Sequence, residues 1–295
     1  MRRHKKIFKT LKIKFQTYFP LIKSMQTGLL LVTGFTGYIS SRPLEIEWQI
    51  IIGLIGSLFL TISGSTVLNM VYDRDIDARM NRTAQRPLPA GKVTTKEALV
   101  LGSMLSLIGL TWAAFLSTLF AVVVFSGLFI DVIIYTVWLK RKTPFSIVWG
   151  GISGGMPILA GRVLGAGQID LIGILLMLSI LLWIPTHILT FNMRHYNDYN
   201  RAGIPTFPAI YGHKNTRLII AISCIGAALA IGLGCYALGL AGGYLRLLAV
   251  LTVGFVGLAI YSIFQPSEKV NFGLFKYASF FMLGSMWMMV LGALK

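Results

Sequence analysis

The stretch "NMVYDRDIDARMNRTAQRPL", residues 69–88, joins the end of a long apolar run to a densely charged segment. Three of the ten acidic residues of the chain, Asp73, Asp75 and Asp77, fall within five positions here. The preceding run, residues 48–71, is long and apolar enough to cross a bilayer as a helix. The stretch therefore marks the point where a membrane helix leaves the hydrocarbon, and it places carboxylates at that point.

The composition of the whole chain is typical of a membrane protein. Of its 295 residues, 55% are hydrophobic and 13% are charged, and the mean hydropathy is +0.74, which is too apolar for an ordinary soluble domain. We predict an all-α fold with nine transmembrane helices. The predicted spans are residues 22–41, 48–71, 97–116, 119–139, 145–164, 169–192, 216–240, 244–264 and 271–294.

The basic residues follow this predicted topology. A formal charge of +17 could indicate a nucleic-acid-binding protein, but 23 of the 27 Lys and Arg residues fall in segments on one side of the predicted membrane. Loops on the cytoplasmic side of membranes carry such an excess of basic residues. We therefore expect a cytoplasmic N-terminus, and no nucleic acid as partner.

The chain is expected to form one membrane domain, residues 21–295, behind a basic arm, residues 1–20. The arm, "MRRHKKIFKTLKIKFQTYFP", lacks acidic residues and the apolar core of a signal peptide, so we expect it to contact anionic membrane lipid. Its short length favours a prokaryotic plasma membrane over a mitochondrial inner membrane. Cys224 and Cys235 lie within one predicted span and are expected to be packing residues.

The spacing of the acidic residues predicts a polar helix face. Asn69, Asp73 and Asp77 are four residues apart and share one side of a helix, whereas Asp75 points roughly the opposite way to Asp73. Ionised groups near hydrocarbon cost several kcal/mol unless they are compensated, so this face is expected to border a polar cavity. Carboxylate and amide oxygens placed in this way suit Mg²⁺, which commonly bridges one or two carboxylates to substrate phosphates.

A simpler alternative is that the three aspartates pair with Arg74, Arg79 and Arg82 on a solvated helix end. Asn69 argues against it, because an amide inside an apolar segment needs a polar partner. The following "RTAQRPLPAG" also supplies Arg82 and Arg86 before a turn stiffened by proline. A metal ion together with arginines is what a bound diphosphate requires.

Two further polar segments are predicted on the same side of the membrane. "PTHILTFNMRHYNDYNRAGIPTFPAIYG", residues 185–212, places His187 inside the sixth span and Asp198 at its exit, followed by Arg201. "YTVWLKRKTP" ends the fourth span with Lys140 and Arg141. The two cations could anchor the helix end at the interface, or they could converge on a diphosphate.

These motifs resemble those of a known family. Asn69-x-x-x-Asp73-x-x-x-Asp77, followed by Arg82 and "RPLPAG", resembles the first motif of the UbiA superfamily of intramembrane prenyltransferases. "YTVWLKRKTP", the Pro185-x-His187 pair and "DYNRAGIPTFP" look most like the branch of that superfamily that farnesylates haem. The resemblance runs over roughly residues 20 to 290.

The resemblance implies a helix bundle around a central cavity, with a lateral opening for lipophilic substrates. It implies an Mg²⁺-dependent transferase that moves a farnesyl group from farnesyl diphosphate to a vinyl group of haem B, giving haem O. The metal ligands and catalytic carboxylates would be Asp73, Asp77 and Asp198, with Asn69 assisting the metal. The residues that bind the diphosphate would be Asn69, Arg82, Arg86, Lys140 and Arg201.

His187 is the candidate for contact with haem. A single histidine in a membrane span is often a hydrogen-bonded packing residue, but it could also orient or ligate a haem. A further partner implied by the product is a downstream enzyme that modifies haem.

Two other functions are kept as alternatives. The first is a prenyltransferase of the same superfamily that acts on a quinone precursor or on a lipid glycerol. The second is a cation-coupled transporter that uses the aspartates as its ion site. A transporter would be expected to carry its acidic residues near the middle of the bilayer, whereas these lie at the ends of spans beside arginine-rich loops.

Overall fold

The computed structural model describes residues 16–294, and the regular elements of this part of the chain are helices. Most of the predicted basic arm therefore lies outside the described residues. The elements in chain order are η1 (Phe19–Ile22), α2 (Ser24–Ser40), α3 (Trp48–Tyr72), α4 (Arg74–Arg79), α5 (Thr95–Leu116), α6 (Thr118–Phe129), η2 (Ile130–Leu139), α7 (Ser146–Ala166), α8 (Leu171–Arg194), α9 (Tyr196–Arg201), α10 (Phe207–Ala237), α11 (Gly242–Phe264) and α12 (Glu268–Ala293).

The all-α membrane fold predicted from the sequence is confirmed. Among the described residues, eight helical spans are long and apolar enough to cross a membrane, and α6 with η2 forms one of them. The first predicted span corresponds to α2, which has 17 residues and is not among the eight. The count of nine spans and the side of the membrane on which the N-terminus lies therefore stay predictions.

Polar side chains fix where several of these helices begin. Thr94, Ser117, Asp170 and Ser267 each accept a hydrogen bond from the backbone N–H three residues later. Such caps satisfy amide groups that have no partner within the helix. Short polar breaks in an apolar sequence therefore separate one long helix from the next.

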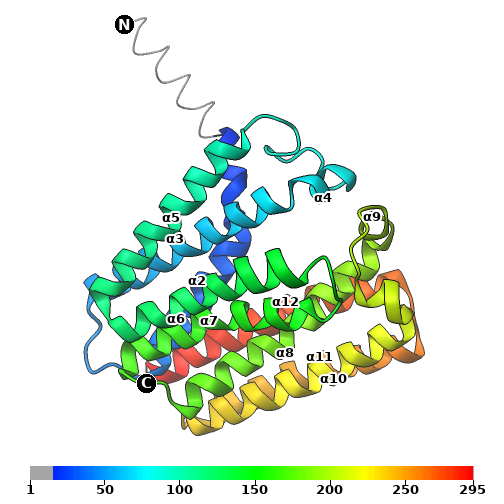
Figure 1. The fold of residues 1–295 in the computed structure, drawn as a ribbon. Coiled ribbons are helices and arrows are strands. Elements are labelled where there is room, and N and C mark those ends of the chain that lie inside the picture. Colours follow the sequence, from blue (N-terminus) through cyan, green and yellow to red (C-terminus); the bar gives the residue numbers. More distant parts are fainter. Residues whose placement is uncertain (1–15, 295) are drawn as a thin grey trace, which may run out of the picture.

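The long helices run side by side, and the short helices α4 and α9 lie at the same end of the bundle (Figure 1). We call this end the α4–α9 end. Ile76 and Met80, from α4 and its end, pack with Ala202 and Ile204, which follow α9. This contact brings together the two acidic loops of the sequence, which are more than 100 residues apart.

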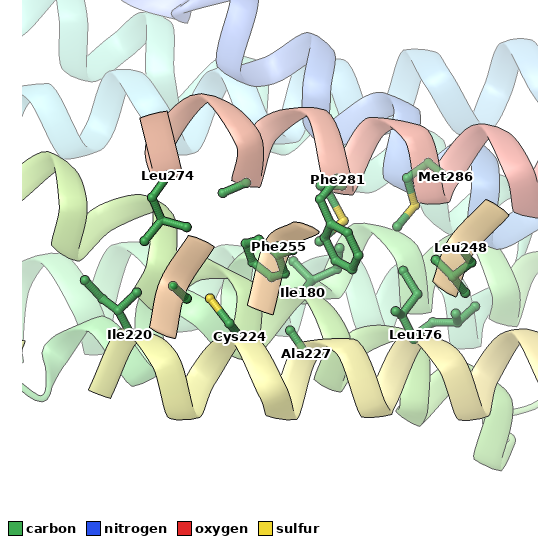
Figure 2. Packing of buried hydrophobic residues seen from close by; sticks show 14 of the residues in the cluster. Leu176, Ile180, Ile220, Cys224, Ala227, Leu248, Phe255, Leu274, Phe281 and Met286 are labelled. Atoms are coloured by element: carbon green, nitrogen blue, oxygen red, sulfur yellow. The ribbon is translucent and has the colours of Figure 1, made fainter. Parts of the chain in front are cut away.

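The main core lies among α8, α10, α11 and α12 (Figure 2). Phe255 of α11 and Phe281 of α12 are fully buried, and their rings stack with centroids 4.4 Å apart. Cys224 and Cys235 are buried free cysteines in the same cluster, as the sequence predicted. This half of the molecule supports α8, which leads into the second acidic loop.

Glycines of the first and fifth predicted spans allow two helices to approach closely. A Cβ atom at Gly161 of α7 would lie 1.9 Å from the carbonyl oxygen of Gly34 in α2, and one at Gly37 would lie 2.0 Å from the Ile158 carbonyl oxygen. Small residues commonly permit such packing in membrane proteins. The contact holds α2 closely against α7.

Arg162, the charged residue of the same span, is buried at the opposite end of the bundle from α4 and α9. Its Nη2 lies 2.6 Å from Oδ2 of Asp170, and its Nη1 donates to the carbonyl oxygen of Ser40. The ion pair therefore joins the ends of α2, α7 and α8. This pairing gives Arg162 a structural role away from the acidic loops.

Candidate active site

The acidic stretch bends the chain but keeps its polar face. α3 and α4 meet at Asp73, whose N–H donates to the Asn69 carbonyl at 2.9 Å. The N–H of Asp77 in turn donates to the Asp73 carbonyl at 2.8 Å. Because the four-residue spacing of an α-helix continues, Asp73 and Asp77 share one face. Both are buried, with 6% and 5% exposure, whereas Asp75 is exposed, as predicted.

Each buried aspartate contacts a cation. The Lys140 ammonium donates to Oδ2 of Asp73, and Nη1 of Arg86 lies 2.7 Å from Oδ2 of Asp77. Lys140 follows η2, and Arg86 lies in the loop after α4. The structure therefore brings four of the predicted site residues into two ion pairs at the α4–α9 end.

The exposed aspartate, Asp75, pairs with an arginine that was not among the partners considered from the sequence. Arg141 donates to both carboxylate oxygens of Asp75, at 2.7 and 2.9 Å, and also to the Tyr72 carbonyl. Arg74, one of the nearby arginines considered as a partner, instead contacts the Thr95 hydroxyl. The hydrogen bond from Arg141, opposed by partial burial, keeps the pKa of Asp75 below its ordinary value. Arg141 therefore forms an exposed, structural ion pair with Asp75.

Arg82 lies between the two acidic loops. Its guanidinium carbon is 4.9 Å from the ring centroid of Phe191 in α8, a cation–π distance. It also lies close enough to the Tyr199 hydroxyl of α9 to affect the pKa of that group. Burial raises the pKa of this hydroxyl, while the positive charge of Arg82 lowers it, with a net increase. Arg82 is therefore held on the second loop and makes no ion pair among the described residues.

The second loop itself reaches the first through a hydrogen bond. Nη1 of Arg201 lies 2.9 Å from Oδ1 of Asn81. Asp198 lies in the first turn of α9 and is half-buried, and its side chain forms no ion pair within the described part of the chain. The two loops are thus adjacent, and Asp198 lies on the second of them.

Sequence reasoning missed a carboxylate that lies deeper in the bundle. Asp131 of η2 accepts hydrogen bonds from Nδ2 of Asn69, at 2.8 Å, and from the Ser65 hydroxyl. Oδ1 of Asn69 accepts from Thr136 at 2.8 Å. The signal was present, because an acidic residue inside a predicted membrane span indicates a functional site by default.

Lys23 is a second residue that was not among the predicted site residues. It precedes α2 in a left-handed backbone conformation, with φ of 43°, which is uncommon for a residue other than glycine. Burial and the positive charges of Arg86 and Lys140 lower its pKa to about 8. For Lys140, burial acts in the same direction, but Tyr135 and Asp73 outweigh it and raise the pKa. Lys140 therefore pairs with Asp73, whereas Lys23 is influenced by the charges of the site.

His187 is held between two aromatic rings. The ring centroids of Trp183 and Phe275 lie 5.0 and 4.4 Å from that of the imidazole, and both rings are stacked on it. Nδ1 lies 3.5 Å from the Ser279 hydroxyl. Phe275 also contacts Phe191, the ring beneath Arg82. Aromatic contacts therefore extend from the acidic loops to His187.

A separate apolar hollow lies between α2, α3 and α12. Its volume is about 190 Å³. The lining is apolar except for one threonine and comprises Leu31, Val32, Phe35, Thr36, Ile55, Met286, Trp287 and Val290. Such a surface suits a hydrocarbon chain better than a charged group.

One carboxylate oxygen of the pair Asp73 and Asp77 suits a hard cation as a ligand. Oδ1 of Asp73 is buried and has no hydrogen-bond partner, while Oδ2 contacts Lys140. Across residues 16–294, however, no group of three or more His, Cys, Asp or Glu side chains gathers closely enough to hold a metal ion. A site with one or two protein carboxylates completed by phosphate oxygens is a common arrangement for Mg²⁺.

Two archaeal proteins are similar to this chain over most of its length. A protein from Pyrobaculum islandicum, named protoheme IX farnesyltransferase, is 36% identical over 268 residues, which cover 89% of this chain and 94% of that protein. A protein of the same name from Archaeoglobus fulgidus is 40% identical over 225 residues, covering 76% of this chain and 79% of its own length.

Solved structures share the fold. A digeranylgeranylglyceryl phosphate synthase superposes with a TM-score of 0.79, at 22% identity, over 95% of this chain and 98% of its own. A UbiA homologue from Archaeoglobus fulgidus, bound to GPP and Mg²⁺, superposes with a TM-score of 0.70, at 13% identity, over 92% of this chain and 99% of its own.

The fold and the ion pairs define a helical membrane protein with a buried cluster of carboxylates and cations at one end of its bundle. The model of the UbiA prenyltransferase family matches residues 30–285. The chain belongs to the UbiA prenyltransferase family. The resemblance in the sequence motifs is thereby confirmed at the level of the family.

Proposed function

We propose that this protein transfers the farnesyl group of farnesyl diphosphate to a vinyl group of protohaem IX (haem B), with Mg²⁺ as cofactor, and so produces haem O. The observation that carries the proposal is the pair of contacts Asp73–Lys140 and Asp77–Arg86 at the end of a membrane helix. Two carboxylates for a metal and two cations for phosphate oxygens lie side by side there. This is the set of charges that a metal-bound diphosphate requires.

The carboxylates would hold the metal. In this proposal Asp73 and Asp77 bind Mg²⁺, Asn69 assists them, and Asp198 approaches from the second loop. The partnerless Oδ1 of Asp73 supports the assignment. Bound there, Mg²⁺ neutralises charge on the diphosphate.

The cations would hold the diphosphate. Arg86 and Lys140 contact the carboxylates directly, so substrate binding would exchange these partners for phosphate oxygens while the metal takes up the carboxylates. Arg82 and Arg201, which extend across the two loops, would bind from the other side. Guanidinium groups suit this task because they bind phosphate oxygens through two parallel hydrogen bonds.

The chemical step breaks the bond between farnesyl C1 and the diphosphate oxygen, and the diphosphate keeps the electron pair. The π electrons of the haem vinyl group then form the new C–C bond. Water adds to the remaining vinyl carbon and releases one proton. The cations of the site act by stabilising the charge that develops on the leaving diphosphate.

The choice of haem as acceptor rests on the two relatives described above. Both are named protoheme IX farnesyltransferase, and they are 36% and 40% identical to this chain. His187 is the residue that we propose for contact with haem, because its ring is fixed between Trp183 and Phe275. Haem O released into the membrane would be passed to a downstream haem-modifying enzyme. We expect the enzyme to reside in a prokaryotic plasma membrane.

A lipid glycerol is the second candidate acceptor. A digeranylgeranylglyceryl phosphate synthase shares the fold, with a TM-score of 0.79 at 22% sequence identity. A quinone precursor belongs to the same alternative. Each would use the same diphosphate site with a different nucleophile.

The test is an acceptor panel. Membrane vesicles containing the protein are given farnesyl diphosphate and Mg²⁺ together with one acceptor: haem B, 4-hydroxybenzoate or a glyceryl phosphate lipid. The products are identified by mass spectrometry. We expect a farnesylated, hydrated haem that is absent from vesicles carrying Asp73→Ala. A prenylated ring or lipid, with unchanged haem, would overturn the choice of acceptor.

A further inference from the structure

Asp131 lies well inside a membrane span. The span Thr118–Leu139 extends eight residues or more on either side of it, whereas Glu97 and Glu268 lie in the first turns of their helices. An isolated carboxylate at such a position is costly unless polar groups surround it. Its position therefore points to a specific task.

Two polar side chains donate to this carboxylate, and a third lies nearby. Oδ2 accepts from the Ser65 hydroxyl and from Nδ2 of Asn69, and the Ser153 hydroxyl lies 3.5 Å from Oδ1. Within the described residues no cation pairs with Asp131. An ionised carboxylate can only accept hydrogen bonds, so it fixes which end of the Asn69 amide can face it.

The π-helical form of η2 supplies the second contact. Backbone hydrogen bonds in such a helix join residues five apart, which therefore lie on the same side, and the Lys140 N–H donates to the Tyr135 carbonyl five residues earlier. Thr136 follows Asp131 by five residues and donates to Oδ1 of Asn69. The amide is therefore held at both ends by one face of η2.

We propose that Asp131 is a positioning residue that fixes the Asn69 amide with its oxygen directed toward the end of the site where Lys140 meets Asp73. The inference rests on the proposed function, because it assigns the Asn69 oxygen to the metal and diphosphate. Asp131 acts through Asn69, because its Oδ2 accepts from the amide nitrogen and so opposes turning the amide over.

The substitution Asp131→Asn tests this orientation while keeping the shape of the side chain. A carboxamide can either donate or accept, so the Asn69 amide could present its NH₂ group to the site. Asn69→Asp places two carboxylates together and removes the donor. The exchanged pair, Asn69→Asp with Asp131→Asn, restores one donor and one carboxylate in reversed positions.

The measurement is the Mg²⁺ concentration that half-saturates binding of farnesyl thiodiphosphate to purified protein, which needs no acceptor. We expect each single variant to require roughly ten-fold more Mg²⁺ and the exchanged pair to recover most of that loss, with melting temperatures close to that of the unaltered protein. Ser153→Ala is the matched control, because it removes the 3.5 Å contact with Asp131 and a hydrogen bond to the Gly150 carbonyl within α7 but leaves Asn69 untouched.

Two results would overturn the assignment. One is an unchanged Mg²⁺ requirement in Asp131→Asn, and the other is an exchanged pair no better than the worse single variant. If Asp131→Asn fails to fold, Thr136→Val and Thr136→Ser apply the same test to the oxygen end of the amide, and equal binding by both would overturn the proposal. A failure of haem farnesylation alone would leave these binding results intact and would count only against the proposed acceptor.

Discussion

Lys140, directly after η2, donates to the buried carboxylate of Asp73, so one ion pair joins the ends of η2 and α3. The Asp73 carboxylate is nearly buried and the lysine side chain is only 21% exposed. A charged hydrogen bond with so little solvent around it is stronger than one on the surface. The contact thus places a cation beside the predicted metal ligand before any substrate is considered.

Replacing Lys140 should weaken prenyl diphosphate binding. We expect Lys140→Met to raise the KM for farnesyl diphosphate roughly 10- to 100-fold, because one charged hydrogen bond is worth about 1.5–3 kcal/mol. Lys142→Met is the matched control, since Lys142 is exposed and lies in the same turn. Steady-state kinetics on vesicles measure both. Equal KM values for the two variants would show that Lys140 is only a structural partner of Asp73.

Substitutions of Asp75 and of Asp77 should have very different effects on activity, although the two residues are only two positions apart. Asp77 is buried against Arg86, whereas the Asp75 side chain is 51% exposed in its pair with Arg141. We expect Asp77→Asn to abolish transfer, and Asp75→Asn to change activity less than about two-fold and stability by less than about 1 kcal/mol. Product formation and melting temperature are the measurements. Loss of activity in Asp75→Asn at unchanged stability would contradict this division.

The face formed by Asn69, Asp73 and Asp77 could be predicted because α-helical hydrogen bonding continues through residues 69–77. The exposure of Asp75 followed from the same periodicity. Local spacing was sufficient here, since the residues concerned belong to one continuous stretch of chain.

The partners of these residues could not be predicted in the same way. Lys140 follows Asp131 by nine positions, and in an α-helix the two side chains would point about 180° apart. The π-helical hydrogen bonding of η2 changes that relation, and both side chains reach α3. No pattern of apolar residues distinguishes a π-helix from an α-helix. Helical periodicity therefore failed at the element that completes the site.

Arg82 and Arg86 show a second limit of sequence reasoning. Both were expected to bind diphosphate, but Arg86 contacts Asp77 and Arg82 lies over Phe191. Their shared loop does not reveal which of them faces which helix. That choice depends on how α4 packs against the residues around α9, a contact between segments more than 100 residues apart.

The close approach of α2 and α7 predicts a large effect of one methyl group. We expect Gly161→Ala to destabilise the protein by about 1–3 kcal/mol, since the new Cβ would lie 1.9 Å from the Gly34 carbonyl oxygen. Gly232→Ala in α10 is the control, because its Cβ would meet nothing within 4 Å and alanine favours a helix. Melting in detergent compares them. A Gly161→Ala protein as stable as the control would mean that the two helices do not pack as described.

His187 gives the most direct test of the acceptor site. His187→Phe keeps an aromatic ring between Trp183 and Phe275, so the stack and the melting temperature should be preserved. The substitution removes both ring nitrogens, and we expect haem B to bind at least about ten-fold more weakly, equivalent to about 1.4 kcal/mol. Titration followed by the haem absorption band measures this, with farnesyl thiodiphosphate binding as the internal control. Unchanged haem affinity would leave His187 as a packing residue and move the haem contact elsewhere on the bundle.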